Sequence, residues 1–82
     1  MFEKDDFENI KLAMMRISNS LNDNIEIAKE EVIYYLTSLD CKALNERALD
    51  IQQAQDISQL KVKLGSIAAL CDLIVKTRYT LC

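Results

Sequence analysis

Three carboxylates in the first half of the sequence have the spacing that acid–base or metal chemistry would need. Asp23, Glu26 and Glu30 are three and four residues apart, so on a helix their side chains share one face. A calcium site requires roughly six to eight oxygen ligands, and the neighbouring sequence does not supply the others. The adjacent pair Asp5-Asp6 diverges by about 100° on a helix and does not converge on a metal. We therefore interpret these carboxylates as helix caps and surface charge, and we predict no metal site.

The amino-acid composition limits the catalytic mechanisms that are open to this chain. The sequence has no histidine, and Gly65 is its single glycine. Without histidine, no Ser-His-Asp or Cys-His arrangement can form within one chain. A phosphate-binding loop needs several glycines close together. We predict that the protein is not an enzyme and has no cofactor.

The three cysteines are Cys41, Cys71 and Cys82. Their number is odd and their spacing is not typical of metal ligands, which favours a reducing compartment and a cytoplasmic location. Cys71 stands in an apolar stretch and is predicted to be a small core residue. For Cys41 and Cys82 we expect ordinary surface positions, where joint replacement by serine changes stability by no more than about a few tenths of a kcal/mol.

Apolar residues recur at intervals of three and four along the whole chain, which predicts helices. The absence of proline and the high content of good helix formers agree with this interpretation. The predicted apolar stripes occupy residues 7–21, 25–36, 44–54 and 57–74.

Polar clusters indicate where these helices begin and end. Residues 18–24 are rich in Asn and Ser, which favours a break, and Asp23 with Glu26 resembles a capping box that opens the next helix. The alternative is one long helix over residues 4–38, because the apolar stripe continues there without losing phase. Asp40 is expected to cap the helix after the break at residues 38–41, and Asp56 with Gln59 forms another possible capping box.

The fold class follows from two stretches, residues 32–36 and 67–75, that are apolar on nearly all sides of their helices. Such helices must be buried on more than one side. We predict an all-α single domain over residues 1–82, an antiparallel bundle of three to four helices. The alternative is a long two-helix hairpin that oligomerises. The apolar runs are too short to span a bilayer and the acidic start does not resemble a secretory signal, so we predict no membrane insertion.

Several apolar and aromatic residues are predicted to contact a partner. Tyr34 and Tyr35 point to different sides of a helix, so we expect one ring in the core and the other at an interface. Met14 and Met15 are expected first to fill the core, and the alternative is an adaptable contact surface. Anchors of the last helix, in the core or at an interface, complete the set of predicted partner-binding residues: Tyr34, Tyr35, Met14, Met15, Ile67, Leu70 and Ile74.

Charge is distributed unevenly along the chain. Residues 1–56 carry twelve acidic and six basic side chains, whereas residues 57–82 carry one acidic and four basic side chains, for a total of −3. Acidic residues near the first helix start and basic residues near the last helix end suit the helix dipoles. With a pI near 4.8, nucleic acid is an unlikely partner.

These features favour a small cytoplasmic protein-binding module, an adaptor, chaperone or inhibitor that uses an apolar helical face, alone or as a homodimer. One alternative is a dimeric nucleic-acid-associated regulator that presents its basic C-terminal helices, with Lys61, Lys63, Lys76 and Arg78. Another, on size and helical class alone, is a subunit or chaperone of a bacterial secretion assembly.

Overall fold

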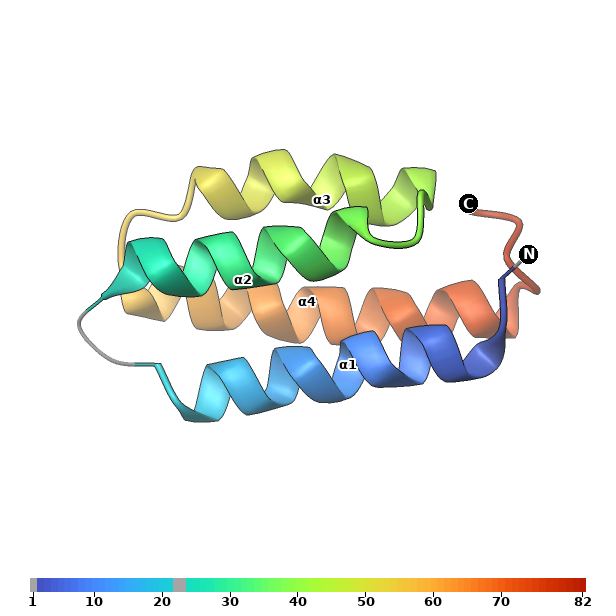
Figure 1. The fold of residues 1–82 in the computed structure, drawn as a ribbon, viewed down its shortest axis with the longest axis horizontal. Coiled ribbons are helices and arrows are strands. Elements are labelled where there is room, and N and C mark those ends of the chain that lie inside the picture. Colours follow the sequence, from blue (N-terminus) through green and yellow to red (C-terminus); the bar gives the residue numbers. More distant parts are fainter. Residues whose placement is uncertain (1, 22–23) are drawn as a thin grey trace.

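The computed structural model describes residues 2–21 and 24–82, which form an antiparallel four-helix bundle (Figure 1). Its helices are α1 (Lys4–Asn19), α2 (Ile25–Thr37), α3 (Lys42–Gln52) and α4 (Ile57–Lys76). Each helix packs against the next one in the chain, and α4 closes the bundle against α1. The predicted all-α bundle is confirmed. The alternative of one helix over residues 4–38 is wrong, because α1 ends at Asn19 and α2 begins at Ile25.

Side-chain caps explain where the helices α2 and α4 begin. The side chain of Asn24 accepts a hydrogen bond from the backbone N–H of Ile27 at 3.3 Å. Asp56 Oδ1 accepts one from the backbone N–H of Gln59 at 2.8 Å, as predicted. In the expected capping box, the side chain of Gln59 would accept a hydrogen bond from the backbone N–H of the cap residue, Asp56. It accepts instead from the backbone N–H of Gln55, one residue earlier.

Two other predicted caps have different outcomes. Asp23 lies outside the described residues, and Asn24 occupies the cap position of α2. The prediction for Asp40 is wrong, because the N-cap of α3 is Cys41. The backbone of Asp40 adopts the left-handed conformation with φ 54°, one residue ahead of the cap, and this turn sets the direction in which α3 leaves α2.

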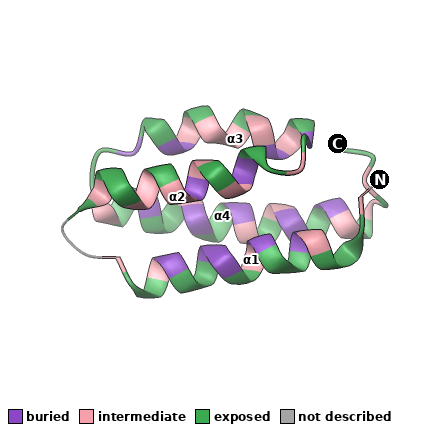
Figure 2. Cartoon of the chain, viewed as in Figure 1, coloured by how far each residue is buried: buried purple, intermediate pink, exposed green. Residues whose placement is uncertain are grey.

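The core is built from apolar side chains along the inner side of every helix, and among the described residues it contains no buried polar or charged residue (Figure 2). Helices α1 and α4 contribute five buried residues each, and α2 and α3 contribute two each. The buried residues of α4 are Leu60, Leu64, Ile67, Cys71 and Ile74. Their three- and four-residue spacing is the period that keeps one side of a helix facing the core.

No helix among the described residues is both long enough and apolar enough to span a membrane.

Candidate functional site

The sides of α1 and α4 that lie opposite their buried stripes carry exposed large apolar side chains. We call this surface the α1/α4 face and define it by Leu12, Met15, Val62, Gly65 and Leu73. Four of the eight large hydrophobic side chains found exposed among the described residues lie here: Leu12, Met15, Val62 and Leu73. Val62 is the most exposed of them, at 74%. Single exposed apolar residues are ordinary, but a group on one face is typical of an interaction surface.

A shallow groove of about 160 Å³ runs along the seam between α1 and α4. Its lining includes Met14 and Leu64, which belong to the core, and Met15, Lys61 and Gly65, which do not. A Cβ atom at Gly65 would have no atom within 4 Å, so the surface at this glycine is open. The helix therefore has its lowest profile at the groove, which leaves room for a side chain from outside.

Ion pairs fix α1 relative to both of its neighbours. Lys11 Nζ lies 3.0 Å from Asp72 Oδ1 of α4, and this hydrogen bond and charge raise the pKa of Lys11. Arg16 Nη2 lies 2.6 Å from Glu31 Oε1 of α2, which raises the pKa of Arg16 for the same reason. Exposed ion pairs of this kind add little stability. Their consequence here is positional, since Lys11 and Asp72 hold α1 and α4 together beside the apolar residues of the face.

The predicted partner-binding residues do not form one site. Ile67 and Ile74 are fully or almost fully buried, so their side chains belong to the core, and Met14 is a buried residue beneath the groove between α1 and α4. Met15 is 49% exposed and belongs to the α1/α4 face. Leu70 is half-buried and lines a different groove, between α3 and α4.

The two adjacent tyrosines diverge as predicted. Tyr34 is 69% exposed, whereas Tyr35 is partly buried against the core. Their rings meet edge to face, with centroids 5.6 Å apart and an interplanar angle of 77°. Both belong to α2, so the exposed ring of Tyr34 lies outside the α1/α4 face.

Three residues of the α1/α4 face were missed by the sequence analysis: Leu12, Val62 and Leu73. Each is an apolar residue that does not belong to the buried stripe of its helix. At about 100° per residue, Val62 is about 200° from Leu60 and therefore points away from the core. An inspection of the side of α4 opposite its stripe would have found the signal, because Val62, Ala69 and Leu73 all lie there.

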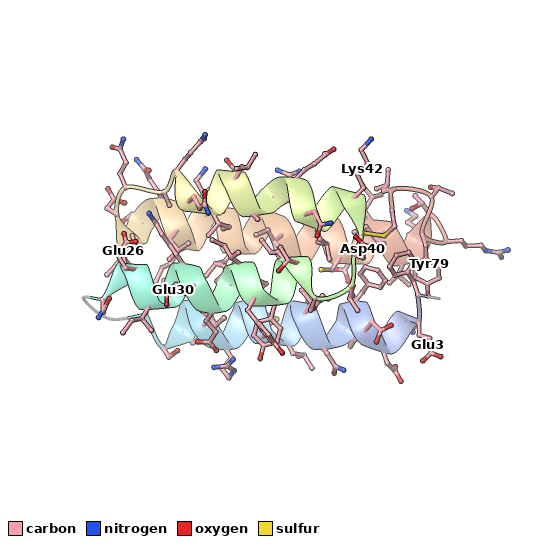
Figure 3. All side chains as sticks on the ribbon, turned by 45° about the horizontal axis from the view of Figure 1, so that its top comes forward. Glu3, Glu26, Glu30, Asp40, Lys42 and Tyr79 are labelled. Carbon is pink, nitrogen blue, oxygen red and sulfur yellow. A yellow bond between two sulfur atoms is a disulfide. The ribbon has the colours of Figure 1, made fainter. Side chains whose placement is uncertain are left out.

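Cys41 and Cys82 form a disulfide, which corrects the prediction that both are ordinary surface positions. Cys41 is completely buried at the start of α3. The segment after α4 crosses the end of the bundle and brings Cys82 to it, although 41 residues separate the two cysteines in sequence. Figure 3 shows the bond in yellow beside Asp40 and Lys42. Spacing in sequence alone could not reveal this approach, which depends on the bundle topology.

Cys71 is a free, buried cysteine, as predicted. Burial raises its pKa to about 11, and the neighbouring carboxylate of Asp72 acts in the same direction. The thiol is therefore neutral at pH 7 and acts as a small apolar core residue, not as a nucleophile.

The basic residues of α4 do not all remain available for a ligand. Lys63 Nζ lies 2.8 Å from Asp50 Oδ1 and joins α4 to α3. Within the described part of the chain, His, Cys, Asp and Glu residues form no group that could hold a metal ion.

Comparison with protein-family models found no match, and comparisons with curated proteins and with solved structures also found none.

Proposed function

We propose that this protein is a small binding module that attaches to another protein through the α1/α4 face. The observation that carries the proposal is that Leu12, Met15, Val62 and Leu73 are exposed on the outer sides of α1 and α4, and that Met15 also lines a groove that is open at Gly65. Burying such side chains against a partner is favourable by about 25 cal/mol for each Å² of apolar surface removed from water.

The shape of the face favours a helical, mainly apolar partner surface. A groove between two antiparallel helices accepts the ridge of a third helix, and the low profile at Gly65 permits a close approach. The pair Lys11 and Asp72 satisfies its own charges within the face, so Lys61 in the groove lining is the charge that a partner would meet there. A second copy of the chain is one partner with such a surface, and an unrelated adaptor target is the other.

The test compares two charge substitutions on the face with a matched substitution elsewhere. Val62→Glu and Leu73→Glu place a charge on the α1/α4 face. Leu49→Glu places the same charge on α3, where Leu49 is 67% exposed. We expect the first two variants to lose self-association, measured by light scattering, or to lose a partner captured quantitatively from the native host. Leu49→Glu should associate like the parent.

Thermal melting provides the control for folding, because exposed substitutions should change stability by only about 0.5 kcal/mol. Equal association of all three variants and the parent would contradict the assignment of the face. Loss of association only in Leu49→Glu would move the site to α3.

If the protein is cytoplasmic, as we propose, its disulfide must be reversible. Thiol-rich compartments keep most cysteines reduced, and disulfides found there are usually transient and regulatory. A cytoplasmic role for this module therefore requires a Cys41–Cys82 bond that opens and closes with the local thiol balance. Trapping the thiols by alkylation in intact cells, followed by mass spectrometry, measures the fraction that is oxidised.

A nucleic-acid-associated role has less support from the structure. Lys63 is paired with Asp50, and the chain carries a net charge of −3. Binding to phosphates depends on several basic groups acting together.

A further inference from the structure

The segment after α4 is held against the bundle in an unusual backbone conformation. We call residues 77–82 the tail. Arg78 and Tyr79 are consecutive, and both adopt left-handed conformations, with φ angles of 55° and 68°. Residues other than glycine rarely adopt this region, because Cβ crowds the backbone there. The surroundings of the tail must therefore maintain its path.

The backbone N–H groups of Arg78 and Tyr79 donate to the carbonyl oxygens of Val75 and Ile74, and two side-chain attachments also maintain the path of the tail. The ring of Tyr79 stacks on Phe7 of α1, with centroids 5.5 Å apart, and Phe2 contacts both rings. The second attachment is the disulfide between Cys82 and Cys41. Figure 3 shows Tyr79 at the same end of the bundle as the disulfide.

The two sulfur atoms of this disulfide have different surroundings. Cys41 is completely buried and is the N-cap residue of α3, where the helix dipole favours negative charge. Lys42 follows it directly and adds a positive charge at this helix end. Cys82 is only partly buried and lines an open groove. An incoming thiol therefore reaches Cys82 more easily than the buried Cys41, and attack on Cys82 makes Cys41 the leaving group.

The tail also forms one wall of that groove, which has a volume of about 640 Å³. Leu81 and Cys82 line it from the tail, Ala43 and Glu46 from α3, and Leu70 from α4. Displacement of the tail would therefore uncover Ala43 and Leu70, which are now partly buried.

We propose that Cys82 is a site of reversible modification by a small thiol of the glutathione class. The glutathione thiolate attacks Sγ of Cys82, a new sulfur–sulfur bond forms, and the Cys41–Cys82 bond breaks with its electron pair leaving on Cys41. The products are a mixed disulfide on Cys82 and a thiolate on Cys41 at the start of α3. In the reverse step, the Cys41 thiolate attacks Cys82 and expels glutathione as its thiolate. No other oxidant or reductant is needed.

This exchange couples the thiol balance to the position of the tail. When the disulfide is open, the aromatic contacts of Tyr79 and the backbone hydrogen bonds of the turn remain, but Cys82 is no longer tied to α3. The groove between α3 and α4 then loses one wall. This inference is independent of the α1/α4 face, because none of the residues that define that face line this groove.

The first experiment uses the unaltered oxidised chain and glutathione at neutral pH. The reaction is stopped with acid, free thiols are alkylated, and the denatured protein is digested with trypsin. Cleavage after Lys29, Lys42, Lys63, Lys76 and Arg78 places the three cysteines in different peptides. We expect the glutathione adduct on Cys82 and alkylation on Cys41, by a ratio of about ten to one. An adduct mainly on Cys41, or exchange on neither cysteine, would overturn the proposal.

The second experiment separates attack from resolution with two matched variants. Both are reduced, treated with oxidised glutathione and then freed of excess reagent. In Cys71→Ala, we expect the Cys82 adduct to disappear as Cys41 closes the disulfide. In Cys41→Ser, the adduct should persist, because the resolving thiol is missing. The same behaviour in both variants would show that Cys41 does not resolve the adduct.

The third measurement reports on the tail itself. Brief trypsin treatment of the native protein should cleave after Arg78 about tenfold faster when the disulfide is open than when it is closed. Equal cleavage rates would show that exchange does not release the tail, and would overturn that part of the proposal.

Discussion

The two helix pairs of the bundle are held in different ways. Helices α1 and α4 are 16 and 20 residues long and together bury ten residues, whereas α2 and α3 are 13 and 11 residues long and bury four. Since apolar burial is the main favourable contribution to folding, the α1/α4 pair supplies most of the stability. We infer that the α2/α3 pair depends more on connections to its neighbours.

Those connections are specific and partly polar. Lys29 Nζ of α2 donates to the carbonyl oxygen of Gln52 at 3.1 Å, at one end of α3. The other end of α3 begins at Cys41, which is bonded to Cys82. The disulfide therefore ties the pair with less buried surface to the chain that continues from α4. The comparison predicts that α2 and α3 open before α1 and α4.

The largest effect is expected from truncation in the α4 core. Leu64→Ala should lower the free energy of unfolding by about 2–5 kcal/mol, because it removes buried methyl groups and leaves a cavity. Urea unfolding followed by circular dichroism measures this change. Val62→Ala, on the exposed side of the same helix, is the control and should differ little from the parent. A loss below about 1 kcal/mol at Leu64 would contradict the dominance of the α1/α4 pair.

Removal of the disulfide should have the next largest effect. In the absence of reductant, Cys82→Ser should lower stability by about 2–4 kcal/mol, because the bond constrains a long loop in the unfolded chain. Hydrogen exchange should accelerate more in α3 than in α1. Under strong reductant, the parent and the variant should have nearly the same stability. Equal acceleration in α1 and α3 would show that the pairs do not open separately.

Loss of a helix cap should have a smaller effect. Asp56→Ala removes the acceptor for the backbone N–H of Gln59 and should cost about 1 kcal/mol. Asp56→Asn keeps a capping oxygen and should recover most of this loss. The measurement is again urea unfolding. No difference between alanine and asparagine at this position would mean that the cap does not limit the stability of α4.

The last effect comes from Cys71 and is absent at neutral pH, because this thiol loses its proton only at high pH. Its thiol has an ordinary pKa near 9.0 when unfolded and about 11 when folded, so the folded protein binds the proton more tightly. Its contribution is fully present below pH 9 and is lost as the pH rises through 11. The parent should therefore lose more stability than Cys71→Ala across this range. If the unfolding free energies of the parent and of Cys71→Ala change equally with pH, burial between α1 and α4 does not raise the pKa of this thiol.

Much of the fold could be predicted from the sequence, because each helix has a continuous buried stripe. The residues Ile67, Cys71 and Ile74 were recognisable by their spacing, and all three are buried. The cap at Asp56 was recognisable because its geometry is local. Asp40 was misjudged because a left-handed turn moved the start of α3 by one residue.

The site was less predictable, because it depends on which side of each helix is left uncovered. Met14 and Met15 have the same side chain, yet only Met15 reaches the surface. Spacing can distinguish them only after the core side is known. The disulfide required still more information, since the order of the helices around the bundle decides that Cys82 meets Cys41.

The packing of α4 against α1 also gives the bundle a circular order. Each helix contacts the next in sequence, and the last contacts the first, so the four helices form a closed ring of neighbours. The rings of Phe2 and Tyr79 lie with centroids 6.1 Å apart, so the segments before α1 and after α4 meet at one end of the bundle. A chain rejoined there and opened at the exposed residue Gln55, between α3 and α4, would keep every neighbouring pair of helices. The fold is thus defined by which helices are neighbours around the ring. The chain could be opened at any one of the connections between helices without changing those neighbours.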